Sequence, residues 1–472
     1  MLASFLFFLA IFAAIGLSSY LKSRGTKKDY YLASQDVPPF LVGLSAVATN
    51  NSGYMFIGVI GYTYATGLAS IWLMVGWILG DLLGSLWVHK SLCRATRETG
   101  ESSYAGVISH WGGSRSTAWQ RLAGLLSLLF LLAYASAQLV AGSKALYVLL
   151  DLPIWSGAAI GGLIVAAYCL AGGIRASIWT DAAQSFVMIG AMGTLLFVAT
   201  QSVGGIGAAI ESMGQVEGFL NWYPQDLLLP GAAGGVIFAL SWLFAGLSVI
   251  GQPHVMVRFM ALKSENRMVQ ARCWYYLWFT AFYAMATGVG MLARIILSDP
   301  GSFDAELALP MMAMDLLSPV FVGLILAGVF AATMSTADSL VLSCSCSLTH
   351  DLLPQRIEKT WMLKVATLLI TAVAVIWALV NKQSVFSLVV LSWSSLASAF
   401  APLLIVLALG GRPTQKVCIA MSLIGLGTAL LWRWLGWHGH IYEGMPGIIA
   451  GLAVFGVARW LVREPLPSGA NA

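Results

Sequence analysis

Charged side chains are scarce in this sequence. Asp, Glu, Lys and Arg make up 10% of the 472 residues and hydrophobic residues 59%, whereas an average soluble domain is about a quarter charged. A soluble chain of this length could not cover its outside with so few polar residues, so lipid must be its main solvent. The net charge of +5 comes from short clusters between apolar runs. These clusters form no continuous basic face, which excludes a nucleic-acid partner.

The motifs of common enzymes are also missing. The chain has no HExxH, Walker or G-x-S-x-G sequence, and its six histidines show no ligand spacing. Six cysteines are scattered without a CxxC pair, and Cys344 and Cys346 fall on opposite sides of a helix. We therefore expect small apolar fillers at the cysteines, with no disulfide and no Cys/His metal site. The protein is not expected to be an enzyme.

Long apolar runs dominate what is present. A bilayer crossing needs about 20 apolar residues. The chain begins with such a run, MLASFLFFLAIF, which lacks the basic start and the cleavage motif of a signal peptide. We expect an all-α polytopic membrane protein built as a single membrane domain over 1–472. Thirteen transmembrane helices are expected, at about 2–21, 39–63, 67–88, 121–149, 153–171, 177–200, 231–252, 273–297, 319–347, 361–381, 384–409, 416–435 and 446–462.

The positive charges predict an orientation. With the N-terminus outside and the C-terminus inside, nearly all Lys and Arg residues fall on the cytoplasmic side, as the positive-inside rule requires. Arg175 and Arg258 are counted among these cytoplasmic loop cations. The exceptions are Lys144, Arg294, Lys382 and Arg433.

Some segments between the spans carry structure of their own. Residues 102–112 are typical of a short interfacial helix on the inside, and a short helix is expected at 205–213 within the outer loop 201–230. Residues 299–318 are expected to form a second outer loop, which carries four acidic residues: Asp299, Asp304, Glu306 and Asp315.

The second span contains a polar run at mid-depth. Thr49, Asn50, Asn51, Ser52 and Gly53 follow one another, and their side chains cannot all face one side of a regular helix. Asn, Ser and Gly also loosen helical geometry. We predict a discontinuous helix whose freed carbonyls and amides line a cavity. The amides after the break are expected to be free and to suit a carboxylate. Helix packing through small polar residues is the alternative.

The ninth span carries a second polar face. Ser335, Asp338 and Ser339 lie at i, i+3 and i+4 and share one side of a helix, with Thr336 beside Ser335. A carboxylate at mid-membrane marks a functional site by default. Hydroxyl and carbonyl oxygens without sulfur or imidazole suit a hard cation. The alternative is a back-bonded Ser/Thr pair packed against a neighbouring helix.

Further polar residues interrupt other spans. Asp181 begins the sixth span and is interpreted either as a functional carboxylate or as a helix cap or salt bridge to Arg175. Asp81 is interpreted as a packing or gating residue. The seventh span is expected to bend at Gly251-Gln252-Pro253, because proline removes a hydrogen-bond donor. The side chains expected to meet a solute, for some of which packing is equally plausible, are Asn50, Ser52, Gly53, Tyr54, Tyr134, Gln138, Trp242, Ser248 and Trp393.

Four blocks of sequence resemble a known family. They are GQPHVMVRFMA (251–261), AATMSTADS (331–339), IRASIWTDAAQ (174–184) and SAVATNNSGYMFIG (45–58). The chain resembles the bacterial sodium:solute symporter family, with the sodium/proline symporters nearest. The resemblance implies a five-plus-five inverted-repeat fold in a bacterial inner membrane. It also implies this division of the domain: a first helix and basic loop (1–38), two repeats (39–200 and 231–409) and C-terminal helices (416–472).

The resemblance also implies a site for sodium, the co-transported ion. The ion would be held by the carbonyls of Ala48, Asn51 and Ala332 and by the hydroxyls of Ser335 and Thr336. A second sodium or a proton would use three further residues, Asp181, Asp338 and Ser339, together with Ser335. This implied function is alternating-access import of a small solute, most simply a proline-like amino acid or another compact zwitterion or carboxylate.

The sequence departs from the sodium/proline symporters around the implied site. Asn50 stands where they have an aspartate, and Asp338 stands where they have serine, so the charge missing at Asn50 could be supplied by Asp338. Ala245 and Val249 replace an aromatic pair, and Gln138 replaces a glycine. Two alternatives remain: a proton-coupled carrier using Asp181 and Asp338, and a sensor that binds solute without moving it. The partners expected are solute and membrane lipid, and the oligomeric state stays open.

Overall fold

Membrane-length helices make up most of the protein, as the sequence predicts. The computed structural model describes residues 1–113, 115–297, 301–353, 357–381 and 383–462. Within these residues twelve helices are long and apolar enough to cross a bilayer. One of them, Pro39–Thr99, has 61 residues, or about 90 Å of helix, and turns at Gly67, whose φ is +74°. Divided at this turn, it supplies the second and third of the thirteen predicted spans.

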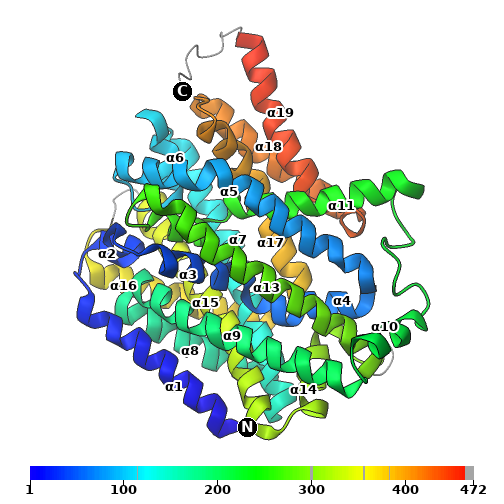
Figure 1. The fold of residues 1–472 in the computed structure, drawn as a ribbon. Helices are drawn as coiled ribbons and strands as arrows, with labels where there is room; N and C mark the ends of the chain where they lie inside the picture. The colour runs from blue at the N-terminus through cyan, green and yellow to red at the C-terminus, as the bar shows by residue number, and fades with distance from the viewer. Residues whose placement is uncertain (114, 298–300, 354–356, 382, 463–472) are drawn as a thin grey trace.

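Most helices follow one another with short connections, and a longer one joins α10 to α11 (Figure 1). Their bounds are α1 Leu2–Ser18, α2 Lys27–Leu32, α3 Pro39–Gly53, α4 Ile60–Thr66, α5 Ile71–Thr99, α6 Tyr104–His110, α7 Thr117–Leu150, α8 Ile154–Gly172, α9 Ile174–Ser202, α10 Ile206–Gly214, α11 Gly231–Leu247, α12 Pro253–Met260, α13 Met268–Ile296, α14 Ala308–Leu316, α15 Pro319–Cys346, α16 Thr360–Val380, α17 Val385–Ala408, α18 Gln415–Trp434 and α19 Gly444–Val462.

Two of the spans are interrupted, and these are the two that the sequence marks. In α3 the backbone of Ser52 has φ 47° and ψ 178°, a conformation that breaks the helix, and a π-helical stretch follows before α4. In the seventh span α11 ends in a short 3₁₀ turn, Gln252 is extended, and Pro253 opens α12. The predicted discontinuity of the second span and the bend of the seventh are both confirmed.

The short segments between spans agree with expectation in two places and differ in one. The interfacial helix expected at 102–112 is α6, and the helix expected at 205–213 is α10. The segment 299–318, expected as a loop, instead contains helix α14, which buries Ala308, Leu309, Pro310, Met312 and Ala313. Asp299 lies outside the described residues.

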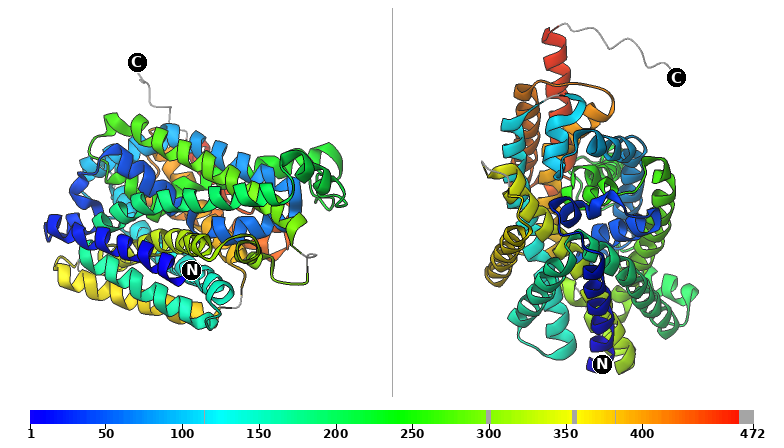
Figure 2. Two further views of the ribbon diagram at one scale, coloured as in Figure 1. Left: turned by 60° about the horizontal axis from the view of Figure 1, so that its bottom comes forward. Right: turned by 90° about the vertical axis from the view of Figure 1, so that its left-hand side faces the viewer.

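The bundle has a buried centre and two flanks. α15 and α17 are the most enclosed spans: in their most apolar windows 83% and 89% of the residues are buried, against 22% for α1. α15 packs against α3, α7 and α9. The first helix lies on one flank and α18 and α19 on the opposite one (Figures 1 and 2). The polar residues of the ninth span are therefore at the centre of the protein.

Glycines let α5 and α11 approach each other closely. A Cβ on Gly80 would lie 1.8 Å from the carbonyl oxygen of Leu243, and one on Gly246 would lie 2.1 Å from the carbonyl oxygen of Trp77. Small residues at such crossings allow two membrane helices to touch through their backbones.

We expect Gly80→Ala to destabilise the protein by about 1–3 kcal/mol, because the added methyl group has to push two backbones apart. Thermal unfolding of the detergent-purified protein measures the effect. Gly190→Ala is the matched control, since a Cβ there meets nothing within 4 Å and gains the same helix propensity. Equal midpoints for the two variants would contradict the tight crossing.

Candidate functional site

The broken α3 and the polar face of α15 lie side by side. The Ser335 hydroxyl donates to the carbonyl oxygen of Ala48 at 3.1 Å and lies 3.1 Å from that of Ala332. The Thr336 hydroxyl donates to the Thr49 carbonyl at 2.9 Å. All five residues are fully buried. Two segments nearly 290 positions apart in the sequence thus bring several oxygen atoms within a few ångströms of one another.

A second helix, α7, holds the break in α3. The Ser52 hydroxyl oxygen accepts hydrogen bonds from the Tyr134 hydroxyl and from the Tyr54 amide, both at 3.1 Å. The Gly53 backbone amide donates to the side-chain oxygen Oε1 of Gln138 at 2.8 Å. The amides after the break were expected to be free, but these two are already bonded to protein side chains. The expectation fails because Ser52 and Gln138 cap the half-helix themselves.

Aromatic rings surround this region. Trp393 meets Tyr134 edge to face, with centroids 6.2 Å apart, and lies 5.4 Å from Trp77. His254 of α12 packs against both Tyr134 and Trp393, and neither of its ring nitrogens has a hydrogen-bond partner. The sequence analysis does not name His254 or Trp77 as solute residues, because only the packing between helices brings them to this region and no local sequence pattern marks them.

Two of the predicted solute residues, Trp242 and Ser248, contact Tyr442. The Trp242 ring stacks on Tyr442 at 5.9 Å, and the Ser248 hydroxyl lies 3.1 Å from the Tyr442 hydroxyl. Ser248 also donates to a carbonyl of its own helix. Trp242 and Ser248 therefore connect α11 to the region of α18 and α19, whereas Ser52, Gly53, Tyr134 and Gln138 gather at the break.

The amides of the polar run take different directions. Asn51 is fully buried, and neither its amide nitrogen nor its amide oxygen has a hydrogen-bond partner. Asn50 instead turns towards α13, where its Nδ2 donates to the Tyr275 hydroxyl at 2.5 Å. The Tyr275 hydroxyl in turn donates to Asp81 of α5 at 2.7 Å.

An arginine that the sequence analysis assigned to a loop lies in the centre of the protein. Arg258 belongs to α12 and is fully buried. Its guanidinium group donates to Ser177 at 2.7 Å, to Ser339, and to Asp181 at 3.4 Å. Its interpretation as a loop cation was wrong, because the helix restarts at Pro253 and carries Arg258 back into the bundle. That restart was the signal available in the sequence.

Asp181 and Asp338 lie around this arginine. Asp181 accepts a hydrogen bond from Ser45 at 2.6 Å, and Asp338 accepts from Ser177 at 3.0 Å. One oxygen of each carboxylate, Oδ1 of Asp181 and Oδ2 of Asp338, has no hydrogen-bond partner. Two acids against one guanidinium leave a net charge of −1 if both are ionised, so the cluster can accept one more monovalent cation.

Arg175 does not pair with Asp181. It donates to Asp29 at 2.6 Å and to the Ala33 carbonyl at 2.9 Å, so the salt bridge proposed from the sequence is wrong. Burial alone would raise the pKa of Asp29, but its hydrogen bonds with Arg175 and with the Arg24 amide bring that pKa below its ordinary value. Asp29 and Arg175 fasten α2 to the start of α9.

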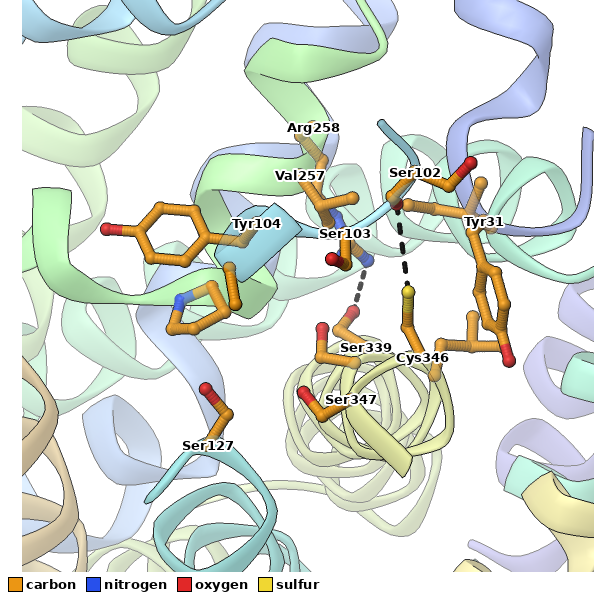
Figure 3. A pocket seen from close by; sticks show the side chains of 15 residues that line it. Tyr31, Ser102, Ser103, Tyr104, Ser127, Val257, Arg258, Ser339, Cys346 and Ser347 are labelled. Atoms are coloured by element: carbon orange, nitrogen blue, oxygen red, sulfur yellow. Dashed lines mark hydrogen bonds between the residues drawn. The ribbon is translucent and has the colours of Figure 1, made fainter. Parts of the chain in front are cut away.

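A cavity reaches the arginine cluster from the end of the bundle that carries α6. Its volume is about 30 Å³, and Arg258 and Ser339 are among the residues that line it. Figure 3 shows Arg258 extending from α12 towards Ser339 of α15. The remaining lining residues are Tyr31, Ser102, Ser103, Tyr104, Ala105, Ser127, Ile174, Pro253, Val257, Leu342, Ser343, Cys346 and Ser347.

The end of the bundle that carries α14 is held by an ionic clasp of three residues. Lys144 donates to Asp304 at 2.6 Å and to Glu306 at 2.5 Å. The Glu306 carboxylate also accepts the backbone amides of Val385 and Phe386 at the start of α17. The Phe386 ring stacks on Tyr54 at 5.4 Å, so the clasp fixes an aromatic cover over the broken helix.

Comparison with known proteins identifies the class. The profile of the sodium:solute symporter family matches residues 30–425, so the chain belongs to that family. The family expected from the sequence is thereby confirmed. A family of transporters makes a small-molecule solute the partner and sodium the co-transported ion, and it accords with a protein that is not an enzyme. The protein is a multi-pass membrane protein, and its bacterial relatives imply the inner membrane.

The curated relatives include two proline transporters. The high-affinity proline transporter PutP of Bacillus subtilis (strain 168) is 28% identical over 451 residues, which cover 93% of each protein. The sodium/proline symporter of Escherichia coli (strain K12) is 29% identical over 460 residues, covering 92% of this chain and 88% of the relative.

Solved structures agree on the fold. A sodium-coupled sialic acid symporter in a substrate-bound outward-open state superimposes with a TM-score of 0.79 at 18% identity, covering 97% of both chains. A nucleobase-cation-symport-1 family transporter in a closed conformation gives 0.56 at 14% identity, covering 92% of this chain and 94% of the other. The predicted all-helical five-plus-five inverted-repeat fold is confirmed.

Proposed function

We propose that the protein imports a compact zwitterionic solute, such as proline or a related amino acid, together with sodium. The observation that carries this proposal is the convergence of α3 and α15. The hydroxyl of Ser335 lies within 3.1 Å of carbonyl oxygens from both helices at the point where α3 is broken. Oxygen ligands from two separately moving segments are what a coupling ion requires.

Sodium would be held by the set expected from the sequence. The carbonyl oxygens of Ala48, Asn51 and Ala332 and the hydroxyls of Ser335 and Thr336 supply a neutral, all-oxygen environment that suits a hard monovalent cation. Asp181, Asp338 and Ser339 form a separate cluster with Arg258. A second sodium or a proton there would balance the extra negative charge.

The solute would occupy the region of the helix break. Ser52, Gly53, Tyr134, Gln138 and Trp393 supply hydroxyls, an amide and aromatic faces without a full charge. Such a lining favours a compact zwitterion over a sugar, which would need several amide and acid side chains. Both curated relatives described above are named for proline, while the small Ala245 and Val249 leave room for a different side chain.

Sodium binding and solute binding would be coupled because sodium orders the broken part of α3. Sodium between α3 and α15 would fix the break around Ser52, so less free energy remains to be spent when the solute binds. The topology that fits the charge distribution has the N-terminus outside and the C-terminus in the cytoplasm. Residues 39–200 and 231–409 would form the two repeats, with 1–38 and 416–472 outside them. The cavity beside α6 would then open towards the cytoplasm and serve release.

Uptake into proteoliposomes tests the proposal. With an inward sodium gradient, labelled proline or another amino acid is expected to accumulate. Replacing external sodium by choline at constant pH is expected to lower the initial rate about tenfold or more, because the driving ion is removed. Competition by a panel of amino acids, carboxylates and sugars identifies the solute class. Uptake that is unchanged in choline but driven by a pH gradient would establish a proton-coupled carrier instead, and binding without accumulation would establish a sensor.

A further inference from the structure

Asp81 is a buried acid that the sodium and solute sites do not use. It lies in the middle of α5, is fully buried, and forms no ion pair among those found within the described residues. Its Oδ2 accepts a hydrogen bond from Tyr275 at 2.7 Å, while its Oδ1 has no hydrogen-bond partner. An ionised carboxylate in this position would carry an uncompensated charge in the membrane, which costs several kcal/mol.

A short chain of hydrogen bonds links Asp81 to the broken helix. The Tyr275 hydroxyl, which donates to Asp81, accepts a hydrogen bond from Asn50 Nδ2 at 2.5 Å. Asn50 is two residues before Ser52, where the backbone of α3 breaks. All of these residues are buried. The two hydrogen bonds run from α5 through α13 to α3 and end two residues before the break.

This arrangement bears on the negative charge that the sodium/proline symporters carry at the position of Asn50. Asp338, which was considered a replacement for it, accepts hydrogen bonds from Ser177 and Ser339 and lies in the arginine cluster. Asp81 is the carboxylate joined to Asn50, through one tyrosine. The acid connected with the second span therefore stands on α5.

The surroundings contain few other ionisable groups. Tyr275, Tyr276 and Arg272 approach from α13, and the Arg272 guanidinium donates to the carbonyls of Ser85 and Leu86. On α5 itself His89 lies two turns further on and stacks on Phe259 of α12. α11, which packs along α5, has no ionisable side chain, and α17 has none either. Within the described part of the chain, no cation forms an ion pair with Asp81.

A proton fits this place better than a metal ion. Sodium needs several oxygens, and the broken α3 can offer backbone carbonyls for it. α5 is a continuous helix at Asp81, so its carbonyls are used within the helix, and among the described residues the carboxylate is approached by tyrosine hydroxyls, Tyr275 at 2.7 Å with Tyr276 beside it. A proton on the free Oδ1 removes the charge without any further ligand.

We propose that Asp81 is a proton-binding site whose occupancy controls the geometry of the break in α3. When Asp81 is ionised, its hydrogen bond from Tyr275 is charge-assisted and roughly twice as strong as a neutral one. Protonation weakens this bond, so the Tyr275 ring is held less firmly at Asp81, and the Asn50 amide that donates to the Tyr275 oxygen can shift with it. The inference goes beyond sodium-coupled uptake, since it adds a second ion that acts at a different helix.

Infrared difference spectroscopy on the purified protein tests the site without relying on transport. We expect a buried carboxylic acid band in the wild type that titrates with pH and is lost in Asp81→Asn. Tyr275→Phe should keep the band and shift its titration. The matched control is Asp151→Asn, which removes an exposed loop carboxylate and should leave the band unchanged.

The outcomes separate cleanly. An Asp81→Asn spectrum identical to the wild type at every pH would overturn the proposal. If that variant cannot be purified folded, Tyr275→Phe decides alone, since an unshifted titration would also overturn it. In proteoliposomes the initial uptake rate at a fixed sodium gradient should depend on pH in the wild type and lose this dependence in Asp81→Asn. Absence of sodium-dependent uptake in the wild type would refute the proposed function and leave the infrared result standing.

Discussion

Replacing Ser335 or Thr336 by alanine is expected to raise the sodium concentration for half-maximal uptake by about tenfold or more, which corresponds to about 1.4 kcal/mol. Each hydroxyl bridges α15 to a carbonyl of α3, at 3.1 Å to Ala48 and 2.9 Å to Thr49. Removing either one takes away a proposed ion ligand and also a contact between the two helices. The maximal rate at saturating sodium should fall much less, because the solute contacts stay.

Initial uptake rates at a series of sodium concentrations measure this effect. Ser185→Ala serves as the control, because Ser185 is equally buried but its hydroxyl bonds only to the Ala182 carbonyl of its own helix. An unchanged sodium requirement in both site variants would remove the sodium assignment, although the helices could still pack as described.

The second large effect is expected at Arg258. Arg258→Met should destabilise the protein by about 3–5 kcal/mol, because it leaves Asp181 and Asp338 buried without a counter-charge. Thermal unfolding in detergent measures the loss. Asp181→Asn added to Arg258→Met should recover much of it, since the double variant buries one charge less.

The double variant shows whether the lost stability comes from the missing positive charge or from the smaller side chain. If Arg258→Met unfolds at the wild-type temperature in sodium and in choline alike, the guanidinium group does not neutralise the two acids. If stability is kept in sodium and lost in choline, sodium has taken the place of the arginine, and the extra cation capacity of the cluster is established.

The local features of the site could be predicted from the sequence, and the partners across helices could not. The break at Ser52 follows from consecutive residues that disfavour helix, and the face of Ser335, Asp338 and Ser339 follows from helical spacing. Both are properties of a few neighbouring residues. The fold class followed from length, hydropathy and the resemblance of four sequence blocks.

Apart from helix α14, which was expected as loop, the failures concern long-range pairing. Arg258 was placed in a loop because the positive-inside rule counts charges between spans and does not see a helix that restarts. The amides after Ser52 were thought free, although Gln138, 85 positions along the chain, caps the Gly53 amide.

The clasp at Glu306 has a consequence for the opening of that end of the bundle. One carboxylate satisfies an ammonium group and two backbone amides at once, so a slight displacement would strand several buried polar groups together. Partly open arrangements of that end of the bundle are therefore disfavoured, so the clasp is expected to be either fully formed or fully broken. Partial opening at this end would therefore expose unpaired polar groups, whereas full closure satisfies all of them.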